Sequence, residues 1–415
     1  MPRTPSHGPL EGIRIIDCST VLAGPLCTML LGDLGADVVK VEPPEGDATR
    51  GWGPPWVGSA EDGTRTAAYF LAVNRNKRSI RLDLSTEDGR EVLRRLLRDA
   101  DAVVENLRVG GFARLGFSDE ALATLNPSLV HLAISGFGTR GPDAEKPGYD
   151  FVIQALGGLM SITGEPDGRP MKVGVAISDV VSGLFGAVAL LGALVARERD
   201  GGTGTRAESR PAGQRVDVSL LQSTLAMLVN QAQSALVTGR APVRRGNAHP
   251  SIVPYQSFTT ADGEIAVSVG SERQWAKLGP AIGVPELAAD PRFGTNGERV
   301  ERRDELTAIL DARFAEGTTA EWLGRLEAAG IPAGPILDLP AAFSTAQAQA
   351  LGSRVPLEHP TLGRVDQVGI PFELSGTPAS IRTPPPLLGE HTAELLAEAG
   401  YAPAEIDRLR GLGVV

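Results

Sequence analysis

The order of apolar segments in the N-terminal third of the sequence is the strongest constraint on the fold. Short apolar runs at residues 14–17, 36–42, 79–84, 102–106 and 129–135 are typical of buried strands. Helix-like stretches at residues 25–35 and 87–99 lie between some of them. Strands that alternate with helices predict βαβ units and a mostly parallel sheet. Ligands bind such α/β sheets at the carboxyl ends of the strands, here residues 19–24, 106–110 and 135–138.

The second half of the sequence has a different organisation. A break rich in Gly, Thr, Arg and Pro at residues 200–213 predicts an exposed loop. A strand end running into a long helix is expected at residues 216–236, and another loop at 240–250. Alternation around Ala261, Asp262 and Gly263 predicts a hairpin over residues 255–269 that opens a small α+β region reaching about residue 331.

From residue 332 the chain is rich in Pro and Gly, with short strands expected at residues 364–369 and a final helix near 392–399. Structureless segments of this length are rare inside a compact domain. We therefore expect this tail to wrap over another domain or another subunit.

Bulk properties limit the class of protein. A chain of 415 residues with 42% hydrophobic and 22% charged residues is expected to form two or three globular domains. Its net charge of −10 argues against nucleic acid or an anionic membrane surface as a partner. The longest apolar run, residues 184–195, is too short to span a membrane, and no secretory signal is visible, so the cytoplasm is the expected location. Cys18 and Cys27 lack metal-ligand spacing, and we expect neither a disulfide framework nor a metal site.

Asp179 is the most informative candidate for chemistry. It is a single carboxylate in a stretch of small and apolar residues, 173–184, and the apolar run that follows predicts a core helix starting just beyond it. A helix N-terminus would favour the charged form of the carboxylate and any oxyanion beside it. The ordinary alternative is an N-cap. The sequence has no dinucleotide or Walker glycine motif, no nucleophile elbow and no His-rich metal cluster, which argues against hydride transfer, nucleotide hydrolysis and catalytic-triad chemistry. Covalent catalysis by a carboxylate remains as a candidate mechanism.

Several sequence blocks, taken together and in order, resemble the class III coenzyme A (CoA) transferases. The blocks cover residues 9–17, 23–25, 34–44, 76–79, 104–108, 114–117, 148–150, 157–164 and 213–219. The resemblance implies an intertwined homodimer of two ring-like chains. Each chain would have a Rossmann-like large α/β domain built from both ends of the sequence and a small central α+β domain. We accordingly expect a large domain at residues 1–200, a linker at 201–225, a small domain at 226–331 and a return segment at 332–415.

The resemblance also implies the reaction and its residues. Asp179 matches the nucleophile that attacks an acyl-CoA thioester, and the CoA thioester is then a substrate, with no prosthetic group. The CoA contacts fall on Leu22, Ala23, Leu82, Asn106, Leu107, Arg108, Arg114 and Ser135. Arg108 and Arg114 are the expected phosphate partners, because a guanidinium engages two oxygens at once. The cluster of Arg75, Lys77 and Arg78 either meets the CoA phosphates or flanks a strand.

Two other functions fit the same resemblance. Racemases of the superfamily move a proton with a His and a Glu, but Tyr149 stands at the position of that His and Gln256 near that of the Glu. A non-catalytic CoA-binding subunit is disfavoured by the intact motif around Asp179. The matched function is therefore CoA transfer from a donor such as succinyl-CoA to a carboxylic acid.

The acid that accepts CoA should be selected by residues 245–258, which resemble the segment of succinyl-CoA-dependent transferases acting on dicarboxylates. His249 in this segment either donates to the acceptor carboxylate or is structural. Trp52 and Tyr149 are the expected walls of the substrate pocket.

Overall fold

The computed structural model describes residues 8–61, 63–200 and 212–415, and these form two compact units. Unit 1 consists of Met1–Leu159, Val173–Leu236 and Gln347–Val415, and unit 2 of Met160–Lys172 and Val237–Ala346. These bounds differ from the expected ones, because residues 160–172 join the small unit, which also extends past residue 331 to Ala346. Most of the loop expected at residues 200–213 lies outside the described residues.

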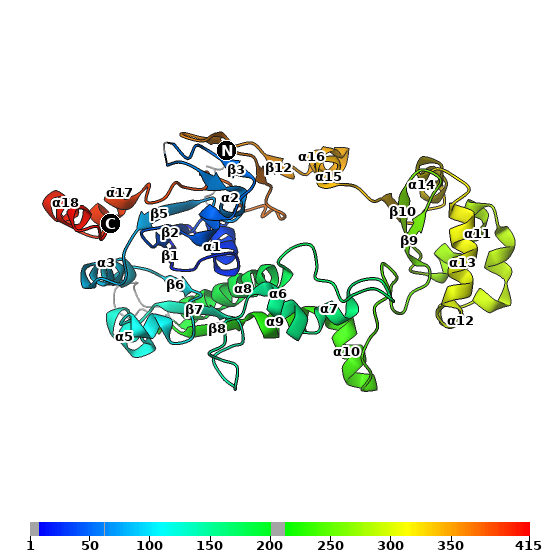
Figure 1. Cartoon of the computed structure of the whole chain (residues 1–415), viewed down its shortest axis with the longest axis horizontal. Coiled ribbons are helices and arrows are strands. Elements are labelled where there is room, and N and C mark those ends of the chain that lie inside the picture. Colours follow the sequence, from blue (N-terminus) through cyan, green and yellow to red (C-terminus); the bar gives the residue numbers. More distant parts are fainter. Residues whose placement is uncertain (1–7, 62, 201–211) are drawn as a thin grey trace. The chain divides into compact units, whose positions relative to one another are not determined.

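Unit 1 is built on a six-stranded parallel sheet (Figure 1), as the alternating segments predict. Its strands are β1 (Arg14–Asp17), β2 (Asp37–Glu42), β5 (Lys77–Arg81), β6 (Ala102–Glu105), β7 (Val130–Ser135) and β8 (Arg215–Ser219). Their order is β5-β2-β1-β6-β7-β8, and every neighbouring pair is parallel. This is the doubly wound order, in which the direction of strand addition reverses between β1 and β6.

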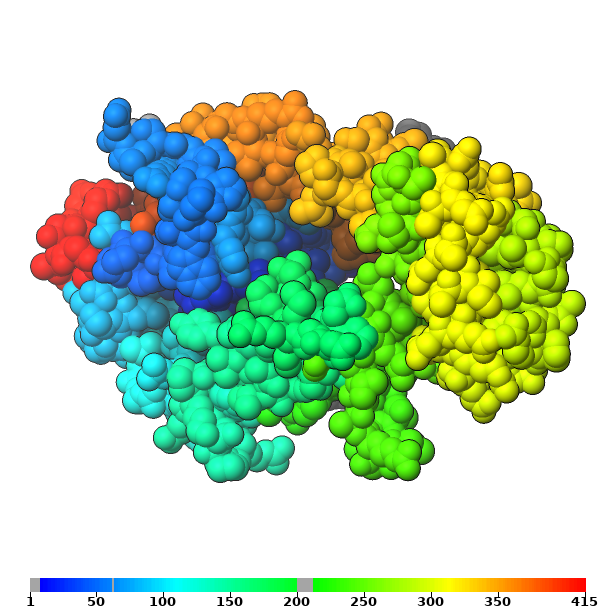
Figure 2. All heavy atoms as spheres, turned by 45° about the vertical axis from the view of Figure 1, so that its right-hand side comes forward, coloured from blue at the N-terminus to red at the C-terminus, as the bar shows by residue number. Residues whose placement is uncertain are grey.

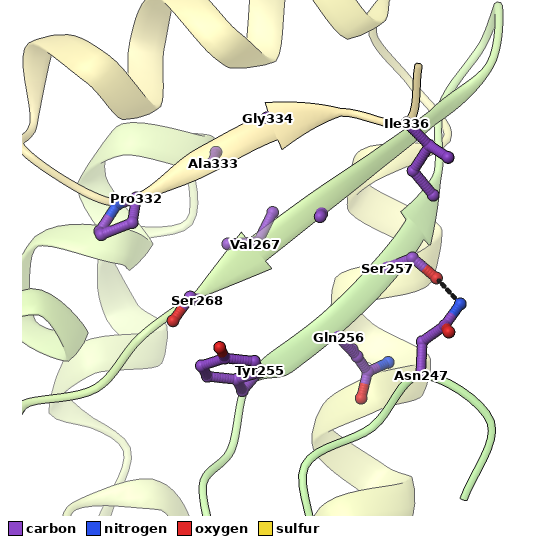
Figure 3. Close-up of a pocket in the computed structure, with 11 residues that line it drawn as sticks. Asn247, Tyr255, Gln256, Ser257, Val267, Ser268, Pro332, Ala333, Gly334 and Ile336 are labelled. Atoms are coloured by element: carbon purple, nitrogen blue, oxygen red, sulfur yellow. Dashed lines mark hydrogen bonds between the residues drawn. The ribbon is translucent and has the colours of Figure 1, made fainter. Parts of the chain in front are cut away.

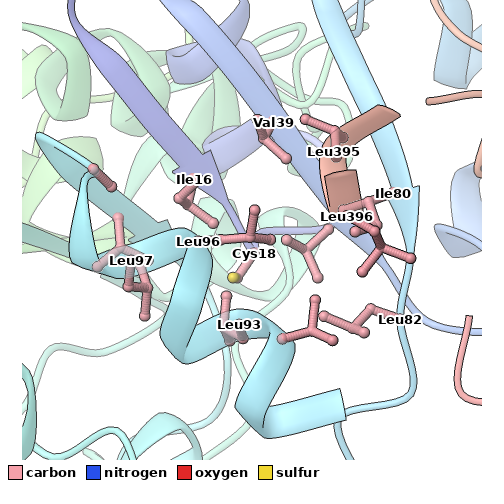
Figure 4. Packing of buried hydrophobic residues seen from close by; sticks show 14 of the residues in the cluster. Ile16, Cys18, Val39, Ile80, Leu82, Leu93, Leu96, Leu97, Leu395 and Leu396 are labelled. Carbon is pink, nitrogen blue, oxygen red and sulfur yellow. The ribbon is translucent and has the colours of Figure 1, made fainter. Parts of the chain in front are cut away.

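Alternate side chains of the strands enter two separate cores. Ile15 belongs to the core that α1 (Ala23–Asp33) and α8 (Ile177–Asp200) cover. Ile16 points to the other face, into a core with α3 (Glu87–Arg98), whose Leu93 and Leu96 are buried there (Figure 4). Both faces of the sheet are therefore sealed by helices, and only the ends of the strands are left for a ligand.

The C-terminal residues complete unit 1. Helices α17 (Thr392–Glu398) and α18 (Pro403–Gly411) close the core of Figure 4, where Leu395 and Leu396 are fully buried. Before them, the orange segment lies beside the blue N-terminal residues in Figures 1 and 2, and Val365 packs on Phe70. Its short strands are β12 (Arg354–Val355), paired with β15 (Gln367–Val368), and β13 (Glu358–His359), paired with β14 (Gly363–Arg364). We predicted α17 but missed α18.

Unit 2 contains the predicted hairpin, formed by β9 (Tyr255–Thr259) and β10 (Glu264–Ser268). A third strand, β11 (Ala333–Pro335), pairs antiparallel with β10, so the small sheet extends beyond the region predicted for it. Phe258, Phe314 and Trp322 form the centre of its core. The helices of this region are α11 (Glu272–Ile282), η2 (Pro285–Ala289), η3 (Pro291–Phe293), α12 (Asn296–Glu301), α13 (Arg303–Phe314), α14 (Thr319–Ala328), α15 (Leu339–Ser344) and α16 (Ala346–Ala350), the last of which begins at the end of unit 2.

Two helix predictions need correction. The helix expected after residue 216 is divided at Leu228 into α9 (Leu220–Met227) and α10 (Val229–Thr238). The helix expected to begin beyond Asp179 begins at Ile177, so this carboxylate lies inside its first turn. The remaining short elements of the chain are η1 (Ala48–Gly51), β3 (Trp56–Val57), β4 (Thr66–Ala67), α2 (Ala68–Leu71), α4 (Gly111–Arg114), α5 (Asp119–Leu125), α6 (Asp150–Leu156) and α7 (Leu159–Ile162).

Helix α8 is the one described helix that is long and apolar enough to cross a bilayer by length and composition alone. Its inner face explains much of this composition, because Ala187, Leu190 and Leu194 are buried in the core over β1 and β7. The core helix of a soluble protein meets the same criterion, so this observation is weak support for a membrane span.

Candidate active site

A cavity of about 230 Å³ lies at the carboxyl edge of the sheet, at the point where strand order reverses. It is lined by the segments that follow β1, β6 and β7, by a loop that leads into α6, and by Asp179 of α8. The lining residues are Thr20, Val21, Leu22, Ala23, Asn106, Leu107, Arg108, Val109, Ile134, Ser135, Gly136, Ala144, Glu145, Lys146, Pro147, Gly148, Tyr149, Asp179 and Leu220. This is where a doubly wound sheet binds its ligands.

Most of the predicted site residues of unit 1 meet in this cavity. Those that line it are Leu22, Ala23, Asn106, Leu107, Arg108, Ser135, Tyr149 and Asp179. They come from five separate parts of the sequence, and the topology of the sheet brings them together. Their roles toward a ligand stay predictions.

The loops around the cavity are held by side chains. The Asn106 amide accepts a hydrogen bond from Thr20 N at 2.9 Å and donates one to Thr20 O at 2.7 Å. Next to it, Val21 has a φ of 71°, which is costly for a β-branched residue. Its N–H is directed at the Asp47 carboxylate at 3.3 Å, and Asp47 forms a buried ion pair with Lys40 at 3.0 Å. A strained loop at the cavity is thus fixed from two sides.

Asp179 is partly buried, and its carboxylate makes no hydrogen bond to any residue that the structure describes. Burial, together with the nearby charge of Asp150, raises the pKa of Asp179 from 3.8 to about 7. This corrects the expectation that the helix N-terminus would favour the charged form. The dipole of α8 opposes the shift by about 1 kcal/mol, but three pKa units correspond to about 4 kcal/mol, so burial prevails.

Asp150 is a residue that the sequence did not single out. It begins α6, and its carboxylate accepts hydrogen bonds from Ser178 N at 2.8 Å and from Gln154 Nε2 at 2.7 Å. The Asp150 carboxylate therefore lies at the start of α8, the place at which we expected Asp179. An Asp followed 28 positions later by a helix start carries no local signal, so only the fold reveals this contact.

Tyr69 is a second residue that the sequence did not reveal. Burial raises the pKa of its phenol, and the charges of Asp179, Asp150 and Asp47 raise it further. The phenol therefore lies within electrostatic reach of the candidate nucleophile. Trp52, predicted as a pocket wall, does not line the cavity but meets the Tyr69 ring edge-on at 5.4 Å.

Two predicted CoA contacts lie outside the cavity. Leu82 is buried in the core beneath α3, so its side chain faces away from solvent. Arg114 is exposed on α4, where its Nη1 lies 3.5 Å from Val109 O. Arg108, by contrast, lines the cavity and is exposed.

The cluster of Arg75, Lys77 and Arg78 is engaged in ion pairs, as in the strand-flanking alternative. Arg75 pairs with Asp33 at 2.7 Å, Lys77 with Asp17 at 3.0 Å, and Arg78 with Asp37 at 2.7 Å. Burial opposes the ionisation of Asp17, but the charges of Lys77 and Lys40 prevail and lower its pKa to about 2. These cations are therefore paired with carboxylates of α1, β1 and β2.

His249 lies in unit 2 in a structural setting. Its Nδ1 accepts a hydrogen bond from Ser251 N at 3.1 Å, and its ring contacts Tyr255 at a centroid distance of 5.3 Å. Burial and the charge of Arg303 lower its pKa, which favours the neutral imidazole. The substrate role proposed for His249 stays a prediction.

Among the described residues there is no group of three or more His, Cys, Asp or Glu side chains placed to hold a metal ion. Cys18 and Cys27 are free and buried, and burial raises the pKa of both thiols far above the ordinary value. Neither thiol therefore provides a thiolate nucleophile at neutral pH.

Comparison with known proteins gives consistent relatives over nearly the whole chain. The profile of CoA-transferase family III matches residues 10–392. The succinate–glutarate CoA-transferase of Agrobacterium fabrum is 44% identical over 391 residues, which are 94% of this chain and 95% of that protein. The mouse succinyl-CoA:glutarate CoA-transferase is 41% identical over 99% of this chain and 91% of its own length. A crystal structure of a CaiB/BaiF family protein from Brucella suis superposes with a TM-score of 0.82 and 41% identity, covering 95% of this chain and all of that one.

Proposed function

This chain belongs to CoA-transferase family III and is an enzyme of that type, and on this premise we propose that it moves CoA from succinyl-CoA to a dicarboxylic acid, with Asp179 as the nucleophile. The observation that carries the proposal is the position of Asp179. It is a partly buried carboxylate in the cavity at the strand-order reversal, beside the loops of Leu22 and Asn106. Glutarate is the first acceptor to test, because the names of both relatives contain it.

The proposed reaction uses this carboxylate as its covalent carrier. Ionised Asp179 attacks the thioester carbonyl of succinyl-CoA, and the C–S bond breaks to give an aspartyl-succinyl anhydride and CoA thiolate. The thiolate attacks the Asp179 carbonyl, which releases succinate and leaves an aspartyl-CoA thioester. The acceptor carboxylate then attacks this thioester to form a second anhydride and the thiolate. Attack of the thiolate on the acceptor carbonyl yields the new acyl-CoA and free Asp179.

The surroundings of Asp179 support this chemistry. Burial destabilises its charged form, and a carboxylate of raised pKa is a stronger nucleophile than an ordinary one. Arg108, exposed in the same cavity, is the proposed partner of a CoA phosphate. The racemase alternative gains no support, because Tyr149 lines the cavity where that reaction needs a His.

A second copy of the chain is the proposed partner. Phe151 and Leu156 of α6, Val188 of α8, and Leu225 of α9 are 57%, 62%, 66% and 48% exposed. Helices α6, α8 and α9 contact one another, so these side chains lie on adjacent elements. Apolar surface of this kind marks an interface. Light scattering on the purified protein should give the mass of a dimer, and a monomer at micromolar concentration would contradict this part of the proposal.

One assay tests the reaction. Succinyl-CoA is mixed with glutarate and other dicarboxylates, and new thioesters are followed by mass spectrometry. Transfer should occur with the wild type and disappear in Asp179→Ala. Hydroxylamine should trap Asp179 as its hydroxamate during turnover. Transfer that survives the substitution would remove Asp179 from the mechanism.

A further inference from the structure

Gln154 is a fully buried polar residue of α6, one helical turn after Asp150. Its Nε2 donates a hydrogen bond to Asp150 Oδ2 at 2.7 Å and lies 3.4 Å from Val175 O. Its Oε1 accepts a hydrogen bond from Val173 N at 2.9 Å. All these residues belong to unit 1. One amide therefore joins Asp150 to the segment that leads into α8 and Asp179.

Both oxygens of the Asp150 carboxylate accept hydrogen bonds from N–H groups. Oδ2 accepts from Gln154 Nε2, and Oδ1 accepts from Ser178 N at 2.8 Å. Such donors suit an ionised carboxylate, because a protonated oxygen would need an acceptor in the same place. Burial is the main cause of the raised pKa of Asp179, and the charge of Asp150 raises it further. Gln154 is thus one hydrogen bond away from the charge that acts on Asp179.

The other charged groups on the elements around α8 have different partners. Helices α1 and α9 carry Asp33 as their one charged side chain, and Arg75 pairs with it. On strands β7 and β8 the titratable groups form a separate network around Asp119, made by His131, Arg215 and Asp217. Three further charged residues line the cavity with Asp179, namely Arg108, Glu145 and Lys146. None of them is a cause of the Asp179 pKa shift, whose causes are burial and Asp150.

Two other amides of the chain show what distinguishes Gln154. The buried Asn126 donates to the carbonyl oxygens of Leu97 and Ala100, at 2.9 and 2.8 Å. In unit 2, Figure 3 shows the Asn247 amide bonded to Ser257, at 2.9 Å, beside β9 and a pocket of about 460 Å³. Both amides donate to neutral groups. Gln154 donates to a carboxylate, and a hydrogen bond to an ionised acceptor is roughly twice as strong as a neutral one.

We propose that Gln154 is a positioning residue of the transfer reaction, which holds the Asp150 carboxylate at the start of α8 and thereby keeps a negative charge beside Asp179. This inference rests on the proposed role of Asp179 as the nucleophile. Gln154 lies outside the cavity and acts through Asp150. Without its amide, the Asp150 carboxylate loses a donor that fixes its position and favours its charge. Asp179 then gives up its proton at a lower pH.

The test compares Gln154→Met with the wild type, because Met has a similar length and no hydrogen-bond donor. The value of kcat/KM for succinyl-CoA is measured from pH 5 to pH 9 at saturating glutarate. The midpoint of its fall on the acidic side, about pH 7 in the wild type, should move down by about 0.5–1 pH unit. The KM for succinyl-CoA at pH 8 should stay within about twofold, since Gln154 does not line the cavity.

A double-mutant cycle with Asp150→Asn separates this role from a merely structural one. If Gln154 acts through the Asp150 charge, Gln154→Met should not move the midpoint of kcat/KM when that charge is already absent. A residue that only keeps water away from Asp179 would move the midpoint equally in both backgrounds. The coupling between the two substitutions is therefore the deciding measurement.

Ser182→Ala is the matched control. Ser182 is also fully buried, and its Oγ donates to Ser178 O at 2.7 Å, so this variant loses a buried hydrogen bond at the same helix start without touching Asp150. It should leave the midpoint unchanged. Thermal unfolding shows which variants fold. If Gln154→Met does not fold, Gln154→Asn takes its place, because the shorter amide withdraws from Asp150 but stays polar, and the midpoint should move in the same direction.

Two results would overturn the inference. One is a midpoint of the Gln154 variant within about 0.2 pH unit of the wild-type value. The other is an equal shift in the wild-type and Asp150→Asn backgrounds. If the wild type transfers no CoA, the proposed function fails instead, and urea denaturation still tests the role of Gln154. The stability gained by Asp179→Asn, measured against pH, reports the ionisation of Asp179, and its midpoint should be lower in the Gln154→Met protein than in the wild type.

Discussion

Replacing Asp179 with Asn should abolish activity and at the same time stabilise the protein, in a way that depends on pH. The folded protein keeps the proton of Asp179 up to about pH 7, whereas the ordinary carboxyl pKa is 3.8. Between these values the folded state binds more protons than the unfolded state, so this group lowers stability as pH rises. Asn carries no charge and removes that cost.

The size of the gain follows from the shift. Three pKa units correspond to about 4 kcal/mol, and partial solvent exposure of the carboxyl reduces this to about 2–4 kcal/mol. The full gain should appear at pH 8, shrink as pH falls through 7, and be nearly gone at pH 4, close to the ordinary pKa of 3.8 at which the unfolded state also takes up the proton.

Urea denaturation of wild type and Asp179→Asn at one protein concentration, from pH 4 to pH 8, measures the difference directly. The pH profile of wild-type kcat/KM is the companion measurement. The value of kcat/KM should fall below about pH 7, as Asp179 becomes protonated. In Asp150→Asn this fall should occur at lower pH, because the substitution removes a negative charge near Asp179 and the Asn side chain still accepts the hydrogen bond from Ser178 N. Equal stability of wild type and Asp179→Asn at pH 8, or a gain that persists at pH 4, would refute the reasoning.

Three further predictions concern the sheet, the helix that carries Asp179 and the cavity. Lys77→Met should destabilise the protein by about 3–5 kcal/mol, because Asp17 is left buried without its partner at 3.0 Å; equilibrium denaturation checks this. Gly183→Ala should destabilise the folded protein by about 1–3 kcal/mol and lower kcat, because the added Cβ would come within 2.6 Å of a carbonyl oxygen of α1. Gly192→Ala is the control on the same helix: its Cβ would meet open space, so it should stabilise the protein slightly. Arg108→Gln should raise the KM for succinyl-CoA about tenfold without changing Tm, and an unchanged KM would remove it from the CoA site.

Local pattern accounts for the core of the fold. We predicted β1, β2, β6, β7 and α3 to within a few residues. A strand buried on both faces appears in the sequence as a short apolar run, and a helix with one buried face appears as a repeat of about 3.6 residues. We did not predict the break between α9 and α10 at Leu228 or the additional strand β11, because tertiary contacts rather than local sequence pattern determine both. The basic cluster at residues 75–78 was ambiguous for the same reason, since a buried ion pair and a ligand site look alike in sequence.

The sequence by itself determined the parallel sheet, because buried strands display their periodicity, and it predicted the strand ends as the place for a ligand. It also named Asp179 as the candidate nucleophile, through the resemblance to class III CoA transferases. Only the tertiary structure decided the electrostatic state of that carboxylate. The Asp150 carboxylate lies at the start of α8, where we expected Asp179, and Tyr69, from a distant segment of the sequence, lies within electrostatic reach of Asp179. The buried Nη1 of Arg303, which has no hydrogen-bond partner among the described residues, was equally hidden, because a donor is known to lack a partner only when its neighbours have been placed.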